Sequence, residues 1–156
     1  MIGSSPNVRQ VGGSHYSQGK DFQHWDLVEK FGLGYLEGCA TKYICRHRSK
    51  NGHEDLLKAE HYIDKLIALA QSEWRQPRGS APQHYISSFC DAYELGPLER
   101  QCMSILCDKW TIVRLQRARH LVAELIHEYK PRARLTGEGI SEGDAVDFTP
   151  PGIDAP

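Results

Sequence analysis

The chain has 156 residues, 40% of them hydrophobic, and a formal charge of −1. That length fits one ordinary domain or two very small ones, and a charge near zero gives no indication of an extended nucleic-acid-binding surface. No apolar run approaches the roughly 20 residues that span a bilayer, and the first residues lack the apolar core of a secretory signal, so we expect a cytoplasmic protein without a membrane partner.

Three helices are predicted in the first half, after a Gly/Ser/Gln-rich extended arm at residues 1–20. Apolar residues recur there at spacings of three and four, which indicates amphipathic helices. Asp21 is the expected N-cap of the first helix, and Gly32 is expected just past its end. The second and third helices are expected at about 33–49 and 54–75.

Three more helices are predicted in the second half, beyond a Pro/Gly-rich break. They are expected at about 84–94, 97–108 and 110–130, and Pro97 suits a first helical turn. From residue 131 onward Gly, Pro and acidic residues predict a disordered tail at 131–156. The sequence therefore predicts an all-α protein, a small bundle of two helical units at 21–75 and 83–130.

The two units resemble each other in sequence. Because neither unit is large enough to bury a sufficient core alone, we expect them to pack face to face. We interpret the second unit as a degenerate copy of the first, because it lacks the cations of the first: Lys42 aligns with Ser104 and Arg46 with Asp108. The alternative is that short amphipathic helices resemble one another by chance. The matched segments are LGYLE (33–37) with LGPLE (95–99) and AEHYIDKLI (59–67) with ARHLVAELI (118–126).

Polar residues of the second and third helices form a candidate anion site. Lys42 and Arg46 are four residues apart and share one helix face. Asp55, Lys58 and Tyr62 share one face of the next helix, and a short turn makes the two helices antiparallel neighbours. Cations bordering one groove suit a phosphate group, which Arg holds in a bidentate manner and Lys as a point charge.

Other residues complete this candidate site. Lys50 is expected at the mouth of the groove, and Tyr62, or Tyr16 from the arm, could stack on a base. Asp55 could accept a proton from an attacking group or hold a metal ion. A helical hairpin covered with surface salt bridges, without any ligand, explains the same spacing. A phosphate-binding loop at 12–21 is excluded because the glycine spacing is wrong and no strand precedes it.

The stretch GLGYLEGCATKYICRHRSKNGHEDLLKAEHYIDKLI, preceded by the pair His15-Tyr16, resembles a family of small phage proteins called phage nucleotide kinases or SaV-like proteins, long catalogued as a domain of unknown function. The resemblance covers residues 15–67. The family has an Asn where this chain has Cys39, which bears on any hydrogen bond made at that place.

The resemblance implies a helical kinase that transfers a phosphoryl group from a nucleoside triphosphate, such as ATP with Mg²⁺, to a deoxynucleoside monophosphate such as dTMP or dGMP. It implies a homo-oligomer. Asp55 becomes the candidate base or metal ligand, and His15 a second group for proton transfer. The implied phosphate contacts are Lys42, Arg46, Lys58 and, as a mobile clamp, Lys50.

Two other functions remain open from the sequence. One is an all-α nucleoside triphosphate pyrophosphohydrolase, which needs paired acidic residues on two helices to hold Mg²⁺. The other is a non-catalytic protein that binds nucleotides or a host factor through the same basic groove. A kinase consumes two nucleotides and yields a diphosphate, whereas the hydrolase consumes one and releases pyrophosphate.

Overall fold

The computed structural model describes residues 23–72 and 82–129, and these residues form six α-helices and no strand. The predicted all-α class is therefore confirmed. The predicted arm and tail lie outside the described residues, as do His15 and Tyr16.

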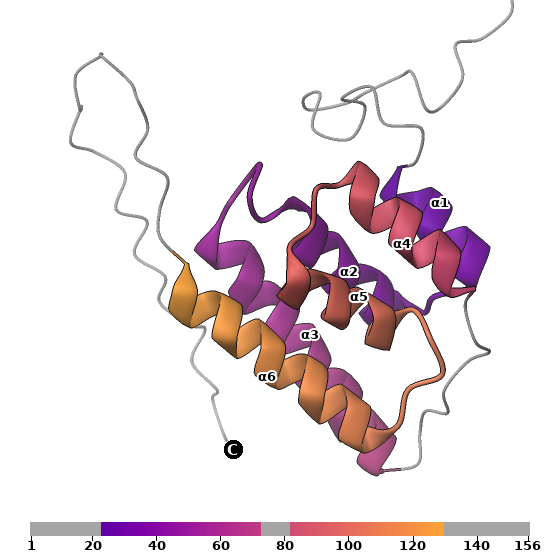
Figure 1. Cartoon of the computed structure of the whole chain (residues 1–156). Helices are drawn as coiled ribbons and strands as arrows, with labels where there is room; N and C mark the ends of the chain where they lie inside the picture. The colour runs from indigo at the N-terminus through magenta and orange to yellow at the C-terminus, as the bar shows by residue number, and fades with distance from the viewer. Residues whose placement is uncertain (1–22, 73–81, 130–156) are drawn as a thin grey trace, which may run out of the picture.

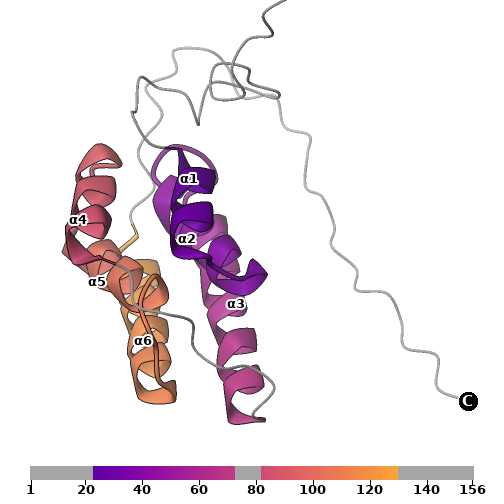
Figure 2. The ribbon, with the colours of Figure 1, turned by 90° about the vertical axis from the view of Figure 1, so that its right-hand side faces the viewer.

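The helices lie in two groups of three that pack side by side (Figures 1 and 2). The long helices α3 and α6 run next to each other and α2 contacts α5, so the two groups share one core. In chain order the helices are α1 (His24–Phe31), α2 (Tyr35–Arg46), α3 (His53–Gln71), α4 (Gln83–Ala92), α5 (Pro97–Leu106) and α6 (Ile112–Glu128).

The helix boundaries differ from the prediction most at both ends of α2 and at the end of α3, which stops at Gln71, four residues before its predicted end. Helix α2 is shorter than predicted because Gly34 is extended (φ −75°, ψ 174°) and His47 already begins a turn that continues to Gly52. The first helix starts after Gln23 and not after the predicted cap. Pro97 occupies the first turn of α5, as predicted, where its missing N–H has no helical acceptor to lose.

The core is built from apolar stripes on every helix, and the α3 and α6 stripes are its longest part. Each fully buried Leu, Ile or Val side chain contributes roughly 1.5–3 kcal/mol by leaving water. All five cysteines are buried and free, so no disulfide supports the fold. The buried stripe of α3 is Leu56, Ala59, Ile63 and Leu66, and that of α6 is Leu115, Ala118, Val122 and Leu125.

The two groups end their first helices in the same way. Gly32 (φ 56°) and Glu94 (φ 52°), which are 62 residues apart, both adopt the left-handed conformation. Behind them, Leu33 N–H donates to the Val28 carbonyl at 2.9 Å, just as Leu95 N–H donates to the Cys90 carbonyl at 2.9 Å. A left-handed residue is easy for glycine and uncommon for glutamate, so the fold, not the residue, imposes this helix end on the second group.

An ion pair between the second and third helix also recurs, with its charges exchanged. Arg46 pairs with Asp55 in the first group, and Asp108 pairs with Arg114 at 3.1 Å in the second. Asp108 lies 62 residues after Arg46, whereas Arg114 lies 59 residues after Asp55, because the intervening turn is shorter. The second unit therefore carries this pair in reversed order, and its interpretation as a degenerate copy stays a prediction.

Two buried carboxylates connect the groups reciprocally. Glu37, near the start of α2, accepts a hydrogen bond from Trp110 Nε1 at 3.3 Å. Glu99, near the start of α5, accepts one from Arg48 Nε at 2.9 Å. Glu99 follows Glu37 by 62 residues, and Trp110 follows Arg48 by the same number. The two contacts are thus related by an approximate twofold arrangement, and the predicted repeat stays a prediction.

Candidate functional site

The tight connection between α2 and α3 brings their polar faces together. Gly52 N–H donates to the His47 carbonyl at 2.8 Å, which closes the turn. Gly52 has φ 54° and lies against Tyr129 at the end of α6, so a Cβ here would come within 1.9 Å of the Tyr129 hydroxyl oxygen. Only glycine therefore fits both the backbone conformation and the space.

The structure places three of the predicted cations around one aromatic ring, Tyr43. Lys42 Nζ lies 4.8 Å from the ring centroid, Arg46 Cζ lies 4.7 Å from it, and Lys58 Nζ lies 5.8 Å from it. Each distance is within the range of a cation–π interaction. We call Lys42, Tyr43, Arg46 and Lys58 the cation–tyrosine cluster.

Arg46 is held in place by a buried carboxylate. Its Nε and Nη2 donate to the two oxygens of Asp55, each at 3.0 Å, in a bidentate pair. The Asp55 side chain is fully buried, whereas that of Arg46 is 14% exposed. Burial of the pair fixes the guanidinium plane, so Arg46 has a fixed orientation before any ligand arrives. In this structure Asp55 positions Arg46, and its predicted role as a base or metal ligand stays a prediction.

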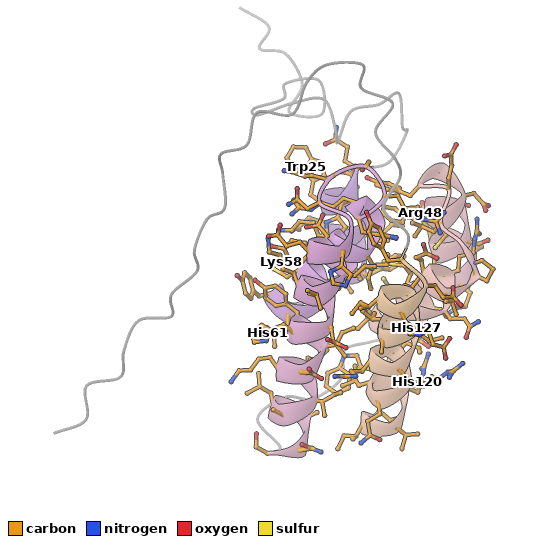
Figure 3. All side chains as sticks on the ribbon, turned by 90° about the vertical axis from the view of Figure 1, so that its left-hand side faces the viewer. Trp25, Arg48, Lys58, His61, His120 and His127 are labelled. Atoms are coloured by element: carbon orange, nitrogen blue, oxygen red, sulfur yellow. The ribbon has the colours of Figure 1, made fainter. Side chains whose placement is uncertain are left out.

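Lys58 and Lys50 are more exposed than Arg46. Lys58 pairs with Glu54 one turn away on α3, and this hydrogen bond is the main reason why the pKa of Lys58 is raised. Figure 3 shows Lys58 on the same side of the molecule as Trp25 and His61, with Arg48 on the other side. Lys50 is exposed in the turn between the helices, so its predicted role as a clamp stays a prediction.

His24 is a buried neighbour of the cluster that sequence analysis missed. Its Nε2 lies 2.9 Å from the Thr41 hydroxyl oxygen, and that hydroxyl donates to the Glu37 carbonyl at 2.8 Å. The pKa of His24 is lowered to about 4, mainly by burial and then by Lys42 and Arg46. A neutral His24 therefore donates from Nε2 to Thr41. The spacing in the first helix indicated only an apolar stripe, and nothing in it marked His24.

Three tyrosines continue the site along α2 and α3. Tyr62 stacks on Tyr43, with centroids 5.7 Å apart and planes at 20°, and its edge meets Tyr35 at 6.0 Å. Its pKa is raised, first by a hydrogen bond with Tyr35, then by burial and by Cys39. Tyr62 was predicted as a platform for a base, but Tyr43 already covers one of its faces. Tyr35 was not singled out from the sequence, although it lies in the quoted stretch and is the first residue of α2.

The positions of these cations suit the site to an anion. No group of three or more His, Cys, Asp and Glu side chains that could hold a metal ion occurs within residues 23–72 and 82–129. Within the same ranges, no helix is long and apolar enough to cross a membrane. The cations gathered at Tyr43 instead suit a phosphate or another multivalent anion.

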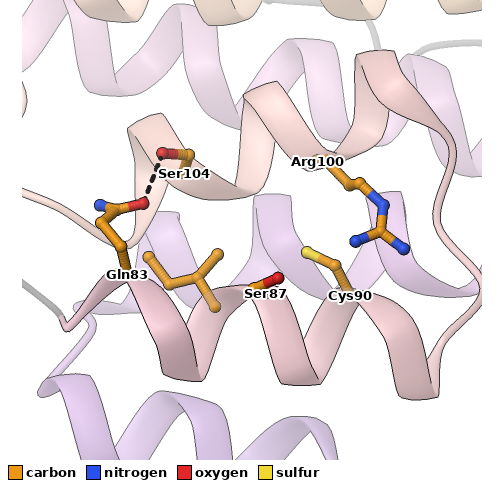
Figure 4. A pocket seen from close by; sticks show the side chains of 6 residues that line it. Gln83, Ser87, Cys90, Arg100 and Ser104 are labelled. Atoms are coloured by element: carbon orange, nitrogen blue, oxygen red, sulfur yellow. Dashed lines mark hydrogen bonds between the residues drawn. The ribbon is translucent and has the colours of Figure 1, made fainter.

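A hollow lies in the other helical group, between α4 and α5 (Figure 4). It measures about 160 Å³, and Ser104 donates a hydrogen bond to Gln83 across it at 3.1 Å. Arg100 borders it but is already paired with Asp91 at 2.7 Å. This hollow therefore offers less concentrated charge than the cation–tyrosine cluster does. Its lining residues are Gln83, Ile86, Ser87, Cys90, Arg100 and Ser104.

Comparison with protein families gives one match. Residues 10–64 match the model of a family described as a protein of unknown function, DUF3310. The match includes the cation–tyrosine cluster and ends within α3, so α4, α5 and α6 lie outside it. No curated protein and no solved structure matches the chain.

The resemblance to phage nucleotide kinases is therefore corrected. The matching family carries no described function, and nothing in the comparisons points to a kinase family. The residues quoted for the resemblance fall mostly inside the match, so they identify a similarity to a family without an activity. What the chain does must be argued from its own geometry.

Proposed function

We propose that the α2–α3 face binds the phosphate of a deoxynucleoside monophosphate, and that the protein transfers a phosphoryl group to it from a nucleoside triphosphate. The observation that carries the proposal is the convergence of Lys42, Arg46 and Lys58 on the ring of Tyr43. Asp55 offsets the charge of Arg46 and Glu54 offsets that of Lys58, so the three cations keep an excess of one positive charge, which a bound anion would balance.

The burial of the Arg46–Asp55 pair supports a site that is ordered before binding. Phosphoryl transfer needs positioning and charge neutralisation more than covalent chemistry. An oxygen of the acceptor phosphate attacks the γ-phosphorus of the donor, and the bond from that phosphorus to the β–γ bridging oxygen breaks. Mg²⁺, bound to the donor phosphates, would neutralise part of the charge, and Lys42 and Lys58 would neutralise the rest.

Binding without turnover is the second candidate, and one observation favours it. Asp55 is fully buried and both of its oxygens accept from Arg46, so it is not placed to take a proton from a ligand. The pyrophosphohydrolase alternative is weaker because no cluster of acidic side chains for Mg²⁺ occurs among the described residues. With either function, the proposal includes a cytoplasmic location and nucleotides as binding partners. It also includes a homo-oligomer.

The test is incubation of the purified chain with each deoxynucleoside monophosphate, ATP and Mg²⁺, with products resolved by chromatography. A deoxynucleoside diphosphate that appears with equimolar ADP supports the kinase. Saturable binding of a monophosphate in calorimetry, without any product, selects the second candidate. Release of pyrophosphate from one nucleotide, or neither binding nor turnover, would overturn the proposal.

Variants locate the activity on the proposed face. Lys42→Ala should weaken monophosphate binding roughly tenfold or more, because a hydrogen bond to a charged group is worth about 1.5–3 kcal/mol. The matched control is Arg117→Ala, since Arg117 occupies in α6 the position that Lys58 occupies in α3, 59 residues earlier. Arg117→Ala should leave monophosphate binding unchanged. If Arg117→Ala and Lys42→Ala weaken binding equally, the binding site does not lie on the α2–α3 face.

A further inference from the structure

An exposed aromatic ring lies next to the cation–tyrosine cluster. The Tyr35 side chain at the start of α2 is 73% exposed, as much as any large hydrophobic side chain described. Its ring meets that of Tyr62 edge to face, at 6.0 Å and 73°, and Tyr62 in turn stacks on Tyr43. A continuous row of three rings thus leads from the cations to an open aromatic surface.

Tyr35 is held in position although it is exposed. An exposed tyrosine on a helix normally changes rotamer freely, and ordering it on binding has an entropic cost. Here the edge-to-face contact with Tyr62 restricts the ring. A ring whose orientation is fixed before binding loses less entropy when a flat ligand stacks on it.

The spacing along α2 sets the kind of ligand that reaches both places. Tyr35 and Lys42 are seven residues apart, so they share one face of the helix at a separation of about 10 Å along its axis. A nucleoside monophosphate, whose sugar lies between the base and the phosphate, spans such a separation. A free phosphate or a diphosphate reaches only the cations.

We propose that Tyr35 is the base-stacking subsite of the α2–α3 face, and that the ligand lies along α2 with its base on Tyr35 and its phosphate at the cation–tyrosine cluster. This inference rests on the proposed binding of a nucleotide. Stacking on an aromatic side chain tolerates every base, because every base has a π face. The subsite therefore selects nucleotides against sugar phosphates and inorganic phosphate, but discriminates little between bases.

The test compares two probes by calorimetry, dTMP and deoxyribose 5-phosphate. Tyr35→Ala should weaken dTMP binding by roughly tenfold, within the range measured for base stacking, and leave deoxyribose 5-phosphate binding unchanged. Tyr35→Phe, which keeps the ring, should retain most of the dTMP affinity. Val113→Ala on α6 removes a side chain of the same 73% exposure and should change neither affinity.

The outcomes separate this inference from the proposed function. If dTMP binds the wild-type chain and Tyr35→Ala leaves its affinity unchanged, the phosphate site stands and the base subsite is wrong. If Tyr35→Ala weakens both probes equally, the residue acts only through the structure of the site, and the subsite is again wrong. If neither probe binds the wild-type chain, the proposed function itself fails.

Discussion

Replacing Asp55 by alanine removes the carboxylate that holds Arg46. Asp55 is fully buried, and the two hydrogen bonds that it accepts from Arg46 are 3.0 Å long. The variant leaves a guanidinium that is only 14% exposed without this partner. Breaking one side of such a buried pair destabilises a protein strongly, because the remaining charge stays out of water.

The expected loss is about 3 kcal/mol in the free energy of unfolding. Removing one partner of a buried pair costs about 3–5 kcal/mol. The lower end applies here because the exposed fraction of Arg46 lets water reach part of its charge. The loss corresponds to a folding equilibrium constant lower by a factor of somewhat over 100.

Urea denaturation followed by circular dichroism measures this loss, and the second helical group supplies the control. Asp108 and Arg114 form the corresponding pair, but their side chains are 18% and 37% exposed. Asp108→Ala should therefore cost only about 1 kcal/mol. Equal losses in Asp55→Ala and Asp108→Ala would refute the argument that burial decides the strength of the pair.

Exchanging the two charges gives a sharper test of the same reasoning. The double variant Arg46→Asp with Asp55→Arg copies the order that Asp108 and Arg114 already have. It should recover at least half of the stability lost in Asp55→Ala, while monophosphate binding should weaken because the Arg46 cation has left the cluster. A double variant no more stable than Asp55→Ala would show that the surroundings of the pair accept only one order.

Three further outcomes can be measured by the same denaturation assay. His24 has a pKa of about 4 in the fold, against 6.5 when unfolded, so its neutral form contributes stability above pH 6.5 that is lost as the pH falls to about 4. His24→Gln can still donate to a hydroxyl and should reduce this pH dependence of the unfolding free energy by about 3 kcal/mol. An unchanged pH profile in this variant would contradict the argument. Gly52→Ala should cost about 1–3 kcal/mol, since a Cβ would strike Tyr129, and a neutral effect would contradict the turn geometry. Arg48→Ala should lower the free energy of unfolding by about 1–3 kcal/mol, because the carboxylate of Glu99 that it pairs with is buried, although half of Arg48 is exposed. A loss below about 0.5 kcal/mol, which is typical of surface substitutions, would contradict a stabilising role of this pair.

The helices could be predicted from sequence because each has a clear apolar period. Their ends were less certain, since they depend on local backbone geometry: α2 stops at Arg46 because the chain turns at His47, three residues before the predicted end. The left-handed conformation of Glu94 could not be predicted, because glutamate does not favour it. The equivalent position of the first group holds Gly32, and glycine adopts this conformation easily.

The candidate site was predictable where spacing decides it. Lys42 and Arg46 share a helix face whatever the tertiary structure, and the short turn brings Lys58 beside them. Contacts that require the folded core could not be predicted, such as the burial of His24 against Thr41. The bidentate hold of Asp55 on Arg46 belongs to the same class, because the sequence marks both residues as charged but does not say which of them is buried.

The reciprocal contacts of Glu37 with Trp110 and of Glu99 with Arg48 have a consequence for cooperativity. Each helical group supplies a carboxylate whose burial is tolerated only while the other group is docked against it. Partial unfolding of either group would remove the hydrogen-bond donor of the buried acid in the group that remains. The chain should therefore lose its structure in a single all-or-none transition, with no stable half-folded species between the native and unfolded states.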